Sequence, residues 1–412
     1  MPVLVPSPVP GRLTTTRRPA PSRRARSELQ ISGTLSVPVY EEELWTSRQR
    51  QASPIHEISY RACFKPQLPA YFIERLTQEG DVVYDPFSGR GTTAIEAALR
   101  GRNVIANDVN PLSAILTRPR LELPSIAEID ARLRTLRFAA RPRSGLDLSM
   151  FFHPDTEHEI LGLREYLFRR HKAGAEDSAD RWIRMVATNR LTGHSPGFFS
   201  VYTLPPNQAV SPEDQMRINA RLRQEPEYRD IRALIMKKTM QLQGRLAASE
   251  RWRLKAAATT ARYLVGEAAV TPHLEPASVQ LTVTSPPFLD VVQYARDNWL
   301  RCWFNGLDAE RITARITMSR SIEEWAAEIS AVFTELYRIT SPGGWVAFEV
   351  GEVRRGAVKL EEIVAPIGIA AGFECVAILI NAQRFTKTAN IWGVANNRLG
   401  TNSNRIVLFR KA

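Results

Sequence analysis

The residues of this sequence best suited to chemistry lie in the segment Thr284–Phe288, which reads TSPPF. An alternating apolar run at 279–283 precedes the segment and predicts a strand. The two prolines must end that strand, because proline has a fixed φ angle and no N–H to donate to a neighbouring strand. Ser285 is therefore expected to leave the carboxyl end of a strand in a stiff loop.

A hydroxyl and a backbone carbonyl in a rigid loop suit the methylation of an exocyclic amine on a nucleobase. Such an amine is a poor nucleophile, because its lone pair is delocalised into the ring. Ser285 and the carbonyl of Pro286 could accept the two amine hydrogens and hold the nitrogen against an electrophilic methyl group. Pro287 would stiffen the loop, and Phe288 could stack on a base flipped out of a duplex. The alternative for so short a segment is a proline-capped surface turn.

A strand, a glycine loop and a helix are predicted over residues 81–100. The strand ends at Asp85, and the loop that follows reads PFSGRGTT. Gly89 and Gly91 would let the backbone approach a ligand closely. The loop lacks the Gly-Lys-Ser/Thr of a triphosphate-binding loop and the third glycine of a dinucleotide fingerprint. It better fits a cofactor that carries a ribose without a phosphate.

A second strand is predicted at residues 103–106, and it leads into Asp108. In nucleotide-binding α/β folds an acidic residue at about this distance from the glycine loop binds the ribose hydroxyls. The glycine loop and this acid together predict a Rossmann-like α/β sheet whose ligand lies at the carboxyl ends of the strands.

These motifs resemble those of the S-adenosylmethionine-dependent DNA amino-methyltransferases. Residues 85–93 (DPFSGRGTT) resemble the cofactor motif of that family, and TSPPF resembles its catalytic loop. Further segments resemble the family in the same order: Phe64–Pro66 before the cofactor motif, Asn107–Pro111 as the ribose-binding turn, Gly266–Ala268 near the adenine, 341–350 as the fifth strand, and 387–411 as the closing hairpin. Glu267 stands where the family usually has Asp.

The resemblance implies a methyltransferase sheet built from residues 36–120 and 262–412, with a mainly helical insertion at 121–261 as the candidate target-recognition region. It also implies S-adenosylmethionine as cofactor and no metal. The cofactor would be bound by Lys65, Pro66, Asp85, Pro86, Phe87, Gly89, Gly91, Thr92, Asp108 and Glu267. The catalytic residues would be Ser285, Pro286, Pro287 and Phe288.

Within the family, a Ser that opens the catalytic loop usually accompanies N4-cytosine methylation, whereas Asp or Asn usually accompanies N6-adenine methylation. Ser285 therefore points to cytosine in duplex DNA. Phe288 replaces the more frequent Tyr and keeps a stacking face. The alternatives are N6-adenine methylation, methylation of an RNA base, and a non-catalytic DNA-binding protein of the same fold. A cognate restriction endonuclease could accompany the enzyme.

Helices are predicted in the insertion at 155–171, 180–191, 211–223 and from 228 past 255. Many of their residues are arginines that could contact phosphates, and the loop between the second and third helices could present His194, Phe198, Phe199 or Tyr202 to bases. Core packing is the competing interpretation for each of these side chains. After the catalytic loop, Asp290 and Asp297 could approach the amine, although surface or cap positions are expected for both. Arg301 could contact phosphates.

Composition supports a polyanionic partner, because the formal net charge is +12 and the isoelectric point is near 9.9. The three cysteines are far apart, which predicts neither a disulfide framework nor a zinc site and fits a reducing cytoplasm. Residues 1–35 are rich in Pro, Arg and Ser and predict a flexible basic arm. The sequence shows no signal-peptide core, and its longest apolar run, 363–380, is interrupted, so no membrane association is expected.

Overall fold

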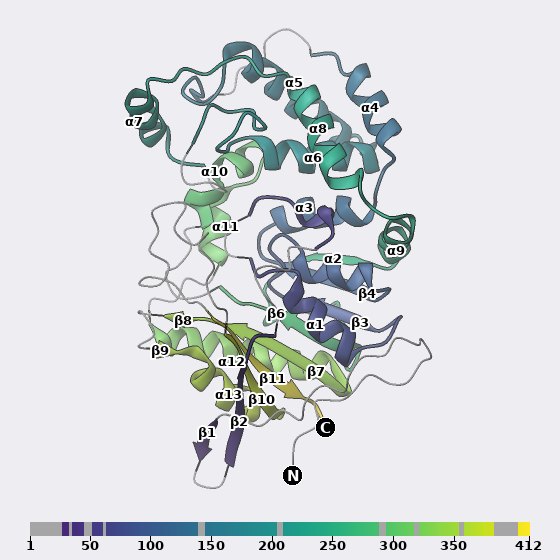
Figure 1. Ribbon diagram of the computed structural model, residues 1–412, viewed down its shortest axis with the longest axis vertical. Helices are drawn as coiled ribbons and strands as arrows, with labels where there is room; N and C mark the ends of the chain where they lie inside the picture. The colour runs from purple at the N-terminus through teal and green to yellow at the C-terminus, as the bar shows by residue number, and fades with distance from the viewer. Residues whose placement is uncertain are drawn as a thin grey trace.

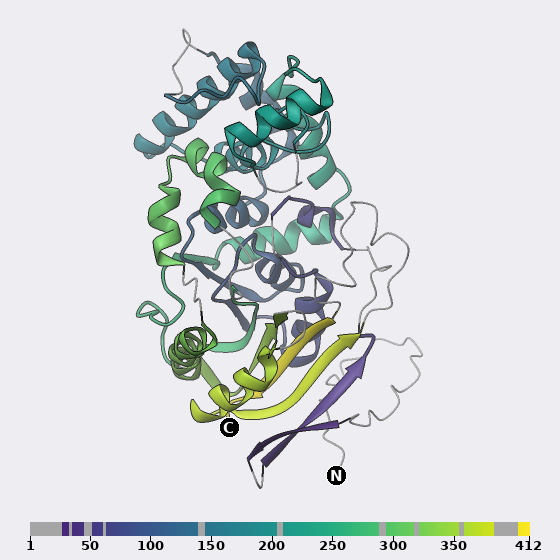
Figure 2. The ribbon, with the colours of Figure 1, turned by 90° about the vertical axis from the view of Figure 1, so that its left-hand side faces the viewer.

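The structure is a computed structural model, and it describes residues 27–32, 35–44, 52–60, 63–138, 145–203, 209–287, 294–316, 321–353, 358–382 and 403–412. Phe288, Asp290 and residues 387–390 lie outside these ranges. The described chain forms an α/β part and a mainly helical part, which lie one above the other (Figures 1 and 2).

The α/β part contains a nine-stranded sheet in the described residues, with the order β1-β2-β10-β11-β7-β6-β3-β4-β5. The strands are β1 (Ser27–Ser32), β2 (Leu35–Glu42), β3 (Val82–Asp85), β4 (Asn103–Asp108), β5 (Arg262–Val265), β6 (Val279–Thr284), β7 (Thr340–Val350), β10 (Glu374–Ala382) and β11 (Ser403–Arg410). Strands β5, β4, β3, β6 and β7 are mutually parallel, and β11 is antiparallel to both β7 and β10. The predicted Rossmann-like sheet is confirmed.

Helices cover both faces of this sheet. Alternate side chains of each strand point to opposite faces, so successive residues of one strand pack against different helices. Val83 of β3 belongs to a core cluster with α1 (Gln67–Leu76), α2 (Thr92–Leu99) and α3 (Leu112–Leu121). Its neighbour Tyr84 belongs to a second cluster. That second cluster is formed with α12 (Ile322–Ile339) and α13 (Leu360–Ala370). Both faces are thus buried, as expected for parallel strands.

The insertion between β4 and β5 is helical, as predicted. Its helices are α4 (Ile126–Thr135), α5 (Pro154–Lys172), α6 (Ser178–Arg190), α7 (Pro212–Leu222), α8 (Ile231–Gln243) and α9 (Ala248–Ala258). The single long helix predicted from residue 228 past 255 is instead two helices. The break follows Gly244, the C-cap of α8, and a new N-terminus forms where the Glu250 side chain accepts a hydrogen bond from the Ala247 N–H.

Two helices follow the catalytic loop: α10 (Tyr294–Asn305) joins the helical part, and α11 (Ala309–Arg315) lies below it, with Arg315 at the cavity described below (Figure 1). Asn305 Nδ2 donates to Thr188 Oγ1 of α6 at 2.9 Å, and Trp299 Nε1 donates to the Val210 carbonyl at 3.1 Å. The helical part therefore draws on residues beyond the predicted insertion of 121–261.

The N-terminal boundary also differs from the sequence prediction. Residues 27–32, which were assigned to the flexible arm, form β1 and pair antiparallel with β2, and β2 pairs in parallel with β10 (Figure 2). Leu29 and Ile31 pack against the second core cluster, which supplies the burial that the Arg-rich residues before them cannot provide.

The remaining small elements are η1 (Pro54–His56) and the pair β8 (Glu352–Val353) and β9 (Val358–Lys359). No helix of the described ranges is long and apolar enough to cross a membrane. In the same ranges, no group of three or more His, Cys, Asp or Glu side chains could hold a metal ion.

Candidate active site

The two motifs meet at the centre of the sheet, where β3 and β6 pair in parallel with Val83 opposite Leu281. The strand order reverses at this pair, because β4 and β5 continue on one side and β7 on the other. Ligands of open α/β sheets bind at such a switch point, beyond the carboxyl ends of the strands. The two strand ends are also joined directly, since Thr284 Oγ1 donates to Asp85 Oδ1 at 2.6 Å.

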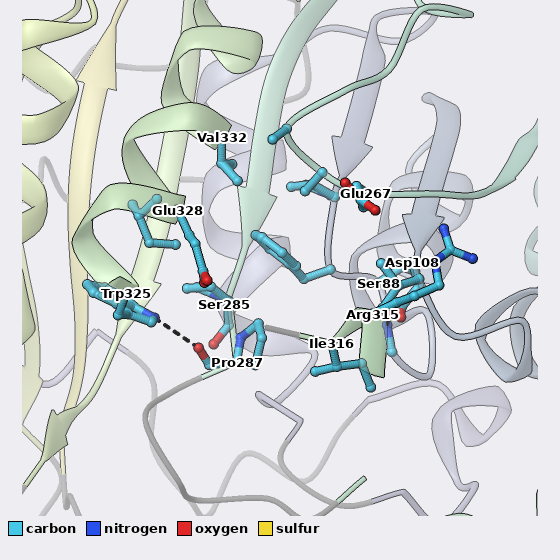
Figure 3. Close-up of a pocket in the computed structure, with 18 of the residues that line it drawn as sticks. Ser88, Asp108, Glu267, Ser285, Pro287, Arg315, Ile316, Trp325, Glu328 and Val332 are labelled. Atoms are coloured by element: carbon cyan, nitrogen blue, oxygen red, sulfur yellow. Dashed lines mark hydrogen bonds between the residues drawn. The ribbon is translucent and has the colours of Figure 1, made fainter. Parts of the chain in front are cut away.

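A cavity of about 410 Å³ opens at these strand ends (Figure 3). Its wall combines the glycine loop, the end of β4, the residues after β5, the catalytic loop and one side of α12. The lining includes Tyr60, Cys63, Phe64, Pro86, Phe87, Ser88, Gly89, Thr92, Asp108, Val109, Glu267, Ala268, Ser285, Pro286, Pro287, Arg315, Ile316, Trp325, Glu328 and Val332. The cavity therefore contacts both predicted motifs.

The end of β4 fixes the shape of the glycine loop. Asp108 Oδ2 accepts the Gly89 N–H at 2.8 Å, and Asp108 Oδ1 accepts the Asn110 N–H at 2.9 Å. Each carboxylate oxygen keeps a lone pair after these contacts. Burial raises the pKa of Asp108 to about 6, although the two backbone N–H groups oppose that shift. The carboxylate can therefore still accept hydrogen bonds from a ligand at neutral pH.

Gly91 acts on the packing of the loop rather than on the cavity. Its φ is +76°, and a Cβ atom placed there would lie 2.2 Å from Thr117 Oγ1 of α3. No side chain fits in that space, so the loop can begin α2 against α3 only with glycine at this position. Gly91 is absent from the cavity lining.

Asp85 lies beneath the cavity and is 1% exposed. Its Oδ1 accepts the Phe87 N–H at 3.1 Å in addition to the Thr284 hydroxyl, whereas its Oδ2 has no partner in the described structure. Burial raises the pKa of Asp85 to about 7, against the opposing effect of these donors. A buried carboxyl held only by neutral groups is typical of functional sites.

The catalytic loop is held from both sides. Glu349, the penultimate residue of β7, lies close enough to Ser285 for the hydroxyl to oppose the rise in its pKa, and Asn404 Nδ2 donates to Glu349 Oε1 at 2.9 Å. Burial raises the pKa of Glu349, while both side chains oppose the shift. On the other side, Trp325 Nε1 donates to the Pro287 carbonyl at 3.1 Å (Figure 3).

Comparison with known proteins adds the family. Residues 21–113, which contain the glycine loop and Asp108, match the family model described as DNA methylase, of the N6 and N4 methyltransferase type. The resemblance to the DNA amino-methyltransferases is confirmed. The match ends before the TSPPF loop.

Three curated proteins are similar to part of this chain. The type II methyltransferase M.MjaII of Methanocaldococcus jannaschii is 32% identical over 20% of this chain and 16% of its own length. The type II methyltransferase M.MvaI of Kocuria varians is 29% identical over 26% of this chain and 23% of its own. The type II methyltransferase M2.DpnII of Streptococcus pneumoniae is 42% identical over 14% of this chain and 22% of its own length. The chain thus spans less than a quarter of the length of each relative.

Most of the residues expected from the amino-methyltransferase resemblance line the cavity: Pro86, Phe87, Gly89, Thr92, Asp108, Glu267, Ser285, Pro286 and Pro287. Lys65, Pro66, Asp85 and Gly91 do not. Lys65 is exposed, and its carbonyl accepts the Leu68 N–H at the start of α1. Phe288 lies outside the described residues, so its stacking role stays a prediction.

Sequence reasoning missed several residues of the cavity. Tyr60 and Cys63 precede the recognised motifs, and Trp325 comes from α12. Glu349 was also missed, although one signal was present: it is the single charged residue in the apolar strand segment 345–350. A lone carboxylate in a buried strand indicates a specific partner.

The structure corrects three expectations about charged and aromatic side chains. Phe198 and Phe199 are buried in the helical part, so they cannot reach bases from the positions they occupy. Asp297 is buried rather than at the surface. Arg301 is also buried, and its Nη1 donates to Asn298 Oδ1 at 2.9 Å, so it is not on a phosphate-contacting face.

Proposed function

We propose that this protein transfers a methyl group from S-adenosylmethionine to an exocyclic amine of a base in double-stranded DNA. One observation carries the proposal: a single cavity joins the glycine loop and Asp108 to Ser285 and Pro286. The first group suits the nucleoside part of a cofactor, and the second suits an amine. The family match supports the same reaction.

The cavity fits the cofactor in chemical character. Asp108 retains acceptor lone pairs for ribose hydroxyls, and Glu267 after β5 offers a further carboxylate. Phe87, Val109 and Ala268 provide an apolar surface for an adenine ring. The bound cofactor would supply an electrophilic methyl group next to the catalytic loop.

Ser285, Pro286 and Glu349 would prepare the amine. Glu349 would accept the Ser285 hydrogen, which would leave the oxygen lone pairs of Ser285 free to accept one amine hydrogen. The Pro286 carbonyl would accept the other, and Trp325 fixes the loop through the Pro287 carbonyl. As the nitrogen gains a methyl group it must lose a proton. A hydrogen bond from Ser285 to Glu349 would provide a route for that proton to a carboxylate.

We assign the amine to N4 of cytosine. The assignment rests on Ser285, because in the resembled family a serine at this position usually accompanies cytosine. N6 of adenine is the competing product. The first test is mass spectrometry of nucleosides, with single-molecule sequencing, on DNA from cells that express the wild type or Ser285→Ala.

Wild-type cells should contain N4-methylcytosine at one short sequence, and Ser285→Ala should lower the methylation rate by roughly a hundredfold or more. Its affinity for S-adenosylmethionine should stay within about twofold of wild type, because Ser285 lies at the amine end of the cavity. N6-methyladenine would keep the reaction class and overturn the base. Unmodified DNA together with methylated RNA would overturn the DNA substrate. A cognate restriction endonuclease remains a prediction from the resemblance.

A further inference from the structure

A second cavity, of about 360 Å³, lies where the helical part meets the α/β part. Its lining includes Ser59, Tyr60, Arg90, Arg190, Ser195 and Lys238. Arg190 ends α6 and Lys238 lies on α8, whereas Arg90 follows Gly89 in the glycine loop. The helical insertion and the glycine loop thus direct three cationic side chains to one space.

The two cations from the insertion are buried, and within the described ranges no carboxylate forms an ion pair with either of them. Arg190 is 7% exposed and Lys238 is 6% exposed. Arg190 donates to Asn189 Oδ1 at 2.8 Å and lies 3.9 Å from the ring centre of Phe198. Lys238 makes no hydrogen bond to any described residue, so its ammonium group has lost water without gaining an acceptor.

The charge around this cavity is strongly positive. Glu57 is the carboxylate of the lining, and it is exposed. Burial lowers the pKa of Lys238 to about 8, with a further contribution from the charge of Arg190, and the negative charge of Glu57 only partly opposes that shift. Burial likewise lowers the pKa of Arg190 to about 10, helped by Arg301. Buried like charges of this kind are costly unless an anion binds among them.

A phosphate group matches this cavity best. Its oxygens can accept hydrogen bonds from an ammonium group, a guanidinium group and serine hydroxyls at once, and its charge offsets that of the cations. Tyr60 lines both this cavity and the one that holds Ser285, so a phosphate bound here would lie one side chain away from the reaction site. A nucleotide whose base entered the first cavity would carry its backbone phosphates close to the shared wall at Tyr60.

We propose that this second cavity binds a backbone phosphate of the DNA strand that carries the target base. The inference rests on the proposed function, and it assigns Lys238 and Arg190 as phosphate ligands next to the active site. Arg90 would then link the phosphate to the glycine loop, since its Nε donates to Thr92 Oγ1 at 3.2 Å and its Nη1 to the Ile58 carbonyl at 3.1 Å.

The test compares Lys238→Met with Lys237→Met. The two lysines are adjacent on α8, but Lys237 is exposed. Binding of a random-sequence DNA duplex is measured by fluorescence anisotropy over a series of salt concentrations. Lys238→Met should weaken binding roughly tenfold at low salt and reduce the slope of log Kd against log salt by about 0.9, as expected for one lost phosphate contact. Lys237→Met should leave both quantities near wild type.

Folding does not confound this comparison. Methionine has a similar length and no charge to bury, so Lys238→Met should melt at or above the wild-type temperature. If Lys238→Met binds DNA with the wild-type affinity and slope while the wild type still methylates DNA, the phosphate site is refuted and the proposed function stands. If the wild type neither binds nor methylates DNA, the proposed function itself has failed.

A thermal-shift measurement distinguishes binding of free inorganic phosphate from binding of the DNA backbone. Inorganic phosphate is added to the wild type and to Lys238→Met, with chloride at equal ionic strength as the control. Stabilisation of the wild type alone, together with an unchanged DNA salt slope in Lys238→Met, would mean that the cavity takes free phosphate and not the DNA backbone. That result would overturn the proposal.

Discussion

Carboxylates at the carboxyl edge of the sheet and carboxylates in the helical insertion have opposite surroundings. Among the residues that the structure describes, the donors to Asp85, Asp108 and Glu349 are neutral, and burial raises the pKa of each carboxyl. In the insertion, the Asp180 carboxylate accepts hydrogen bonds from Arg132, from Arg170 and from the Tyr166 hydroxyl. Burial opposes ionisation of Asp177 as well, but Arg132 holds the pKa of Asp177 below its ordinary value.

The difference separates two uses of the same chemical group. Paired carboxylates fix helices to one another, since Arg132 of α4 and Arg170 of α5 meet on Asp180 of α6. Carboxylates that are not paired with cations can still accept hydrogen bonds from a bound cofactor or substrate. Substitutions in the insertion should therefore change stability, whereas those at the sheet edge should change ligand binding, rate or pH dependence.

The largest effect is expected from Asp180→Ala. This side chain is fully buried, so its removal leaves Arg132 and Arg170 without their shared carboxylate. The free energy of unfolding should fall by about 3–5 kcal/mol, measured by urea denaturation. Asp130→Ala, which breaks an exposed pair with Arg134, should cost less than about 1 kcal/mol. Equal losses in the two variants would contradict a structural role for the buried cluster.

Asp85→Asn tests the opposite surroundings. The folded-state pKa of Asp85, about 7, lies above its ordinary value of 3.8. The folded protein therefore holds a proton that the unfolded chain has lost, and wild-type stability falls as pH rises from about 4 to 7. Asparagine does not titrate, so the variant lacks this decrease in stability. The free energy of unfolding of the variant relative to wild type should therefore rise by up to about 4 kcal/mol between pH 4 and 8.

The measurement for Asp85→Asn is urea denaturation of the protein without ligand at several pH values. Asp130→Asn serves as the control, because Asp130 is partly exposed and paired at the surface. A stability difference that does not change with pH would show that Asp85 is ionised in the folded state throughout, and the proposed contrast with Asp180 would fail at this residue.

Glu349→Gln should reduce the rate of methyl transfer roughly a hundredfold at saturating cofactor. Glutamine keeps the side-chain volume but cannot accept the Ser285 proton as a carboxylate does. The wild-type rate should fall as pH drops through the raised pKa of Glu349, and this acid limb should be missing in the variant. A pH–rate profile checks both points. If the acid limb of the pH–rate profile is unchanged in the variant, the titrating group is not Glu349.

The smallest effect is expected from Asp108→Asn, which should weaken cofactor binding roughly tenfold with little change in the rate at saturation. Because the pKa of Asp108 is about 6, wild-type affinity should also fall below that pH, while the affinity of the variant should not. Isothermal titration calorimetry measures both. Glu349→Gln is the reciprocal control, and its cofactor affinity should match wild type.

The sequence predicted the parts of the site that are local in the chain. Asp85, Gly89 and Asp108 lie within one strand-loop-helix-strand unit, so their spacing alone places them together. Glu349 could not be found in this way. It lies near Ser285 because β7 pairs with β6 and places Phe348 opposite Thr284. That strand pairing depends on the packing of the whole sheet and cannot be read from local spacing.

Aromatic and basic residues of the insertion were harder to predict for a different reason. Phe198 belongs to a polar loop in sequence, yet it is buried under the Arg190 guanidinium group. Arg301 was read as a surface cation, but its Nη2 donates to the Ser59 carbonyl at 3.3 Å. Helical periodicity does not specify which distant segment will cover a side chain, so tertiary packing decided both cases.

The position of the insertion has a consequence for biosynthesis. Strands β4 and β5 are neighbours, but the whole insertion separates them in the chain. At ordinary translation speeds, Asp108 leaves the ribosome on the order of ten seconds before Ser285. Helices α4 to α9 thus have time to form while β3 still lacks β6. We expect that a ribosome-stalled chain that has exposed its residues up to about 261 outside the ribosome would protect these helices from protease before β6 pairs with β3 and completes the cavity.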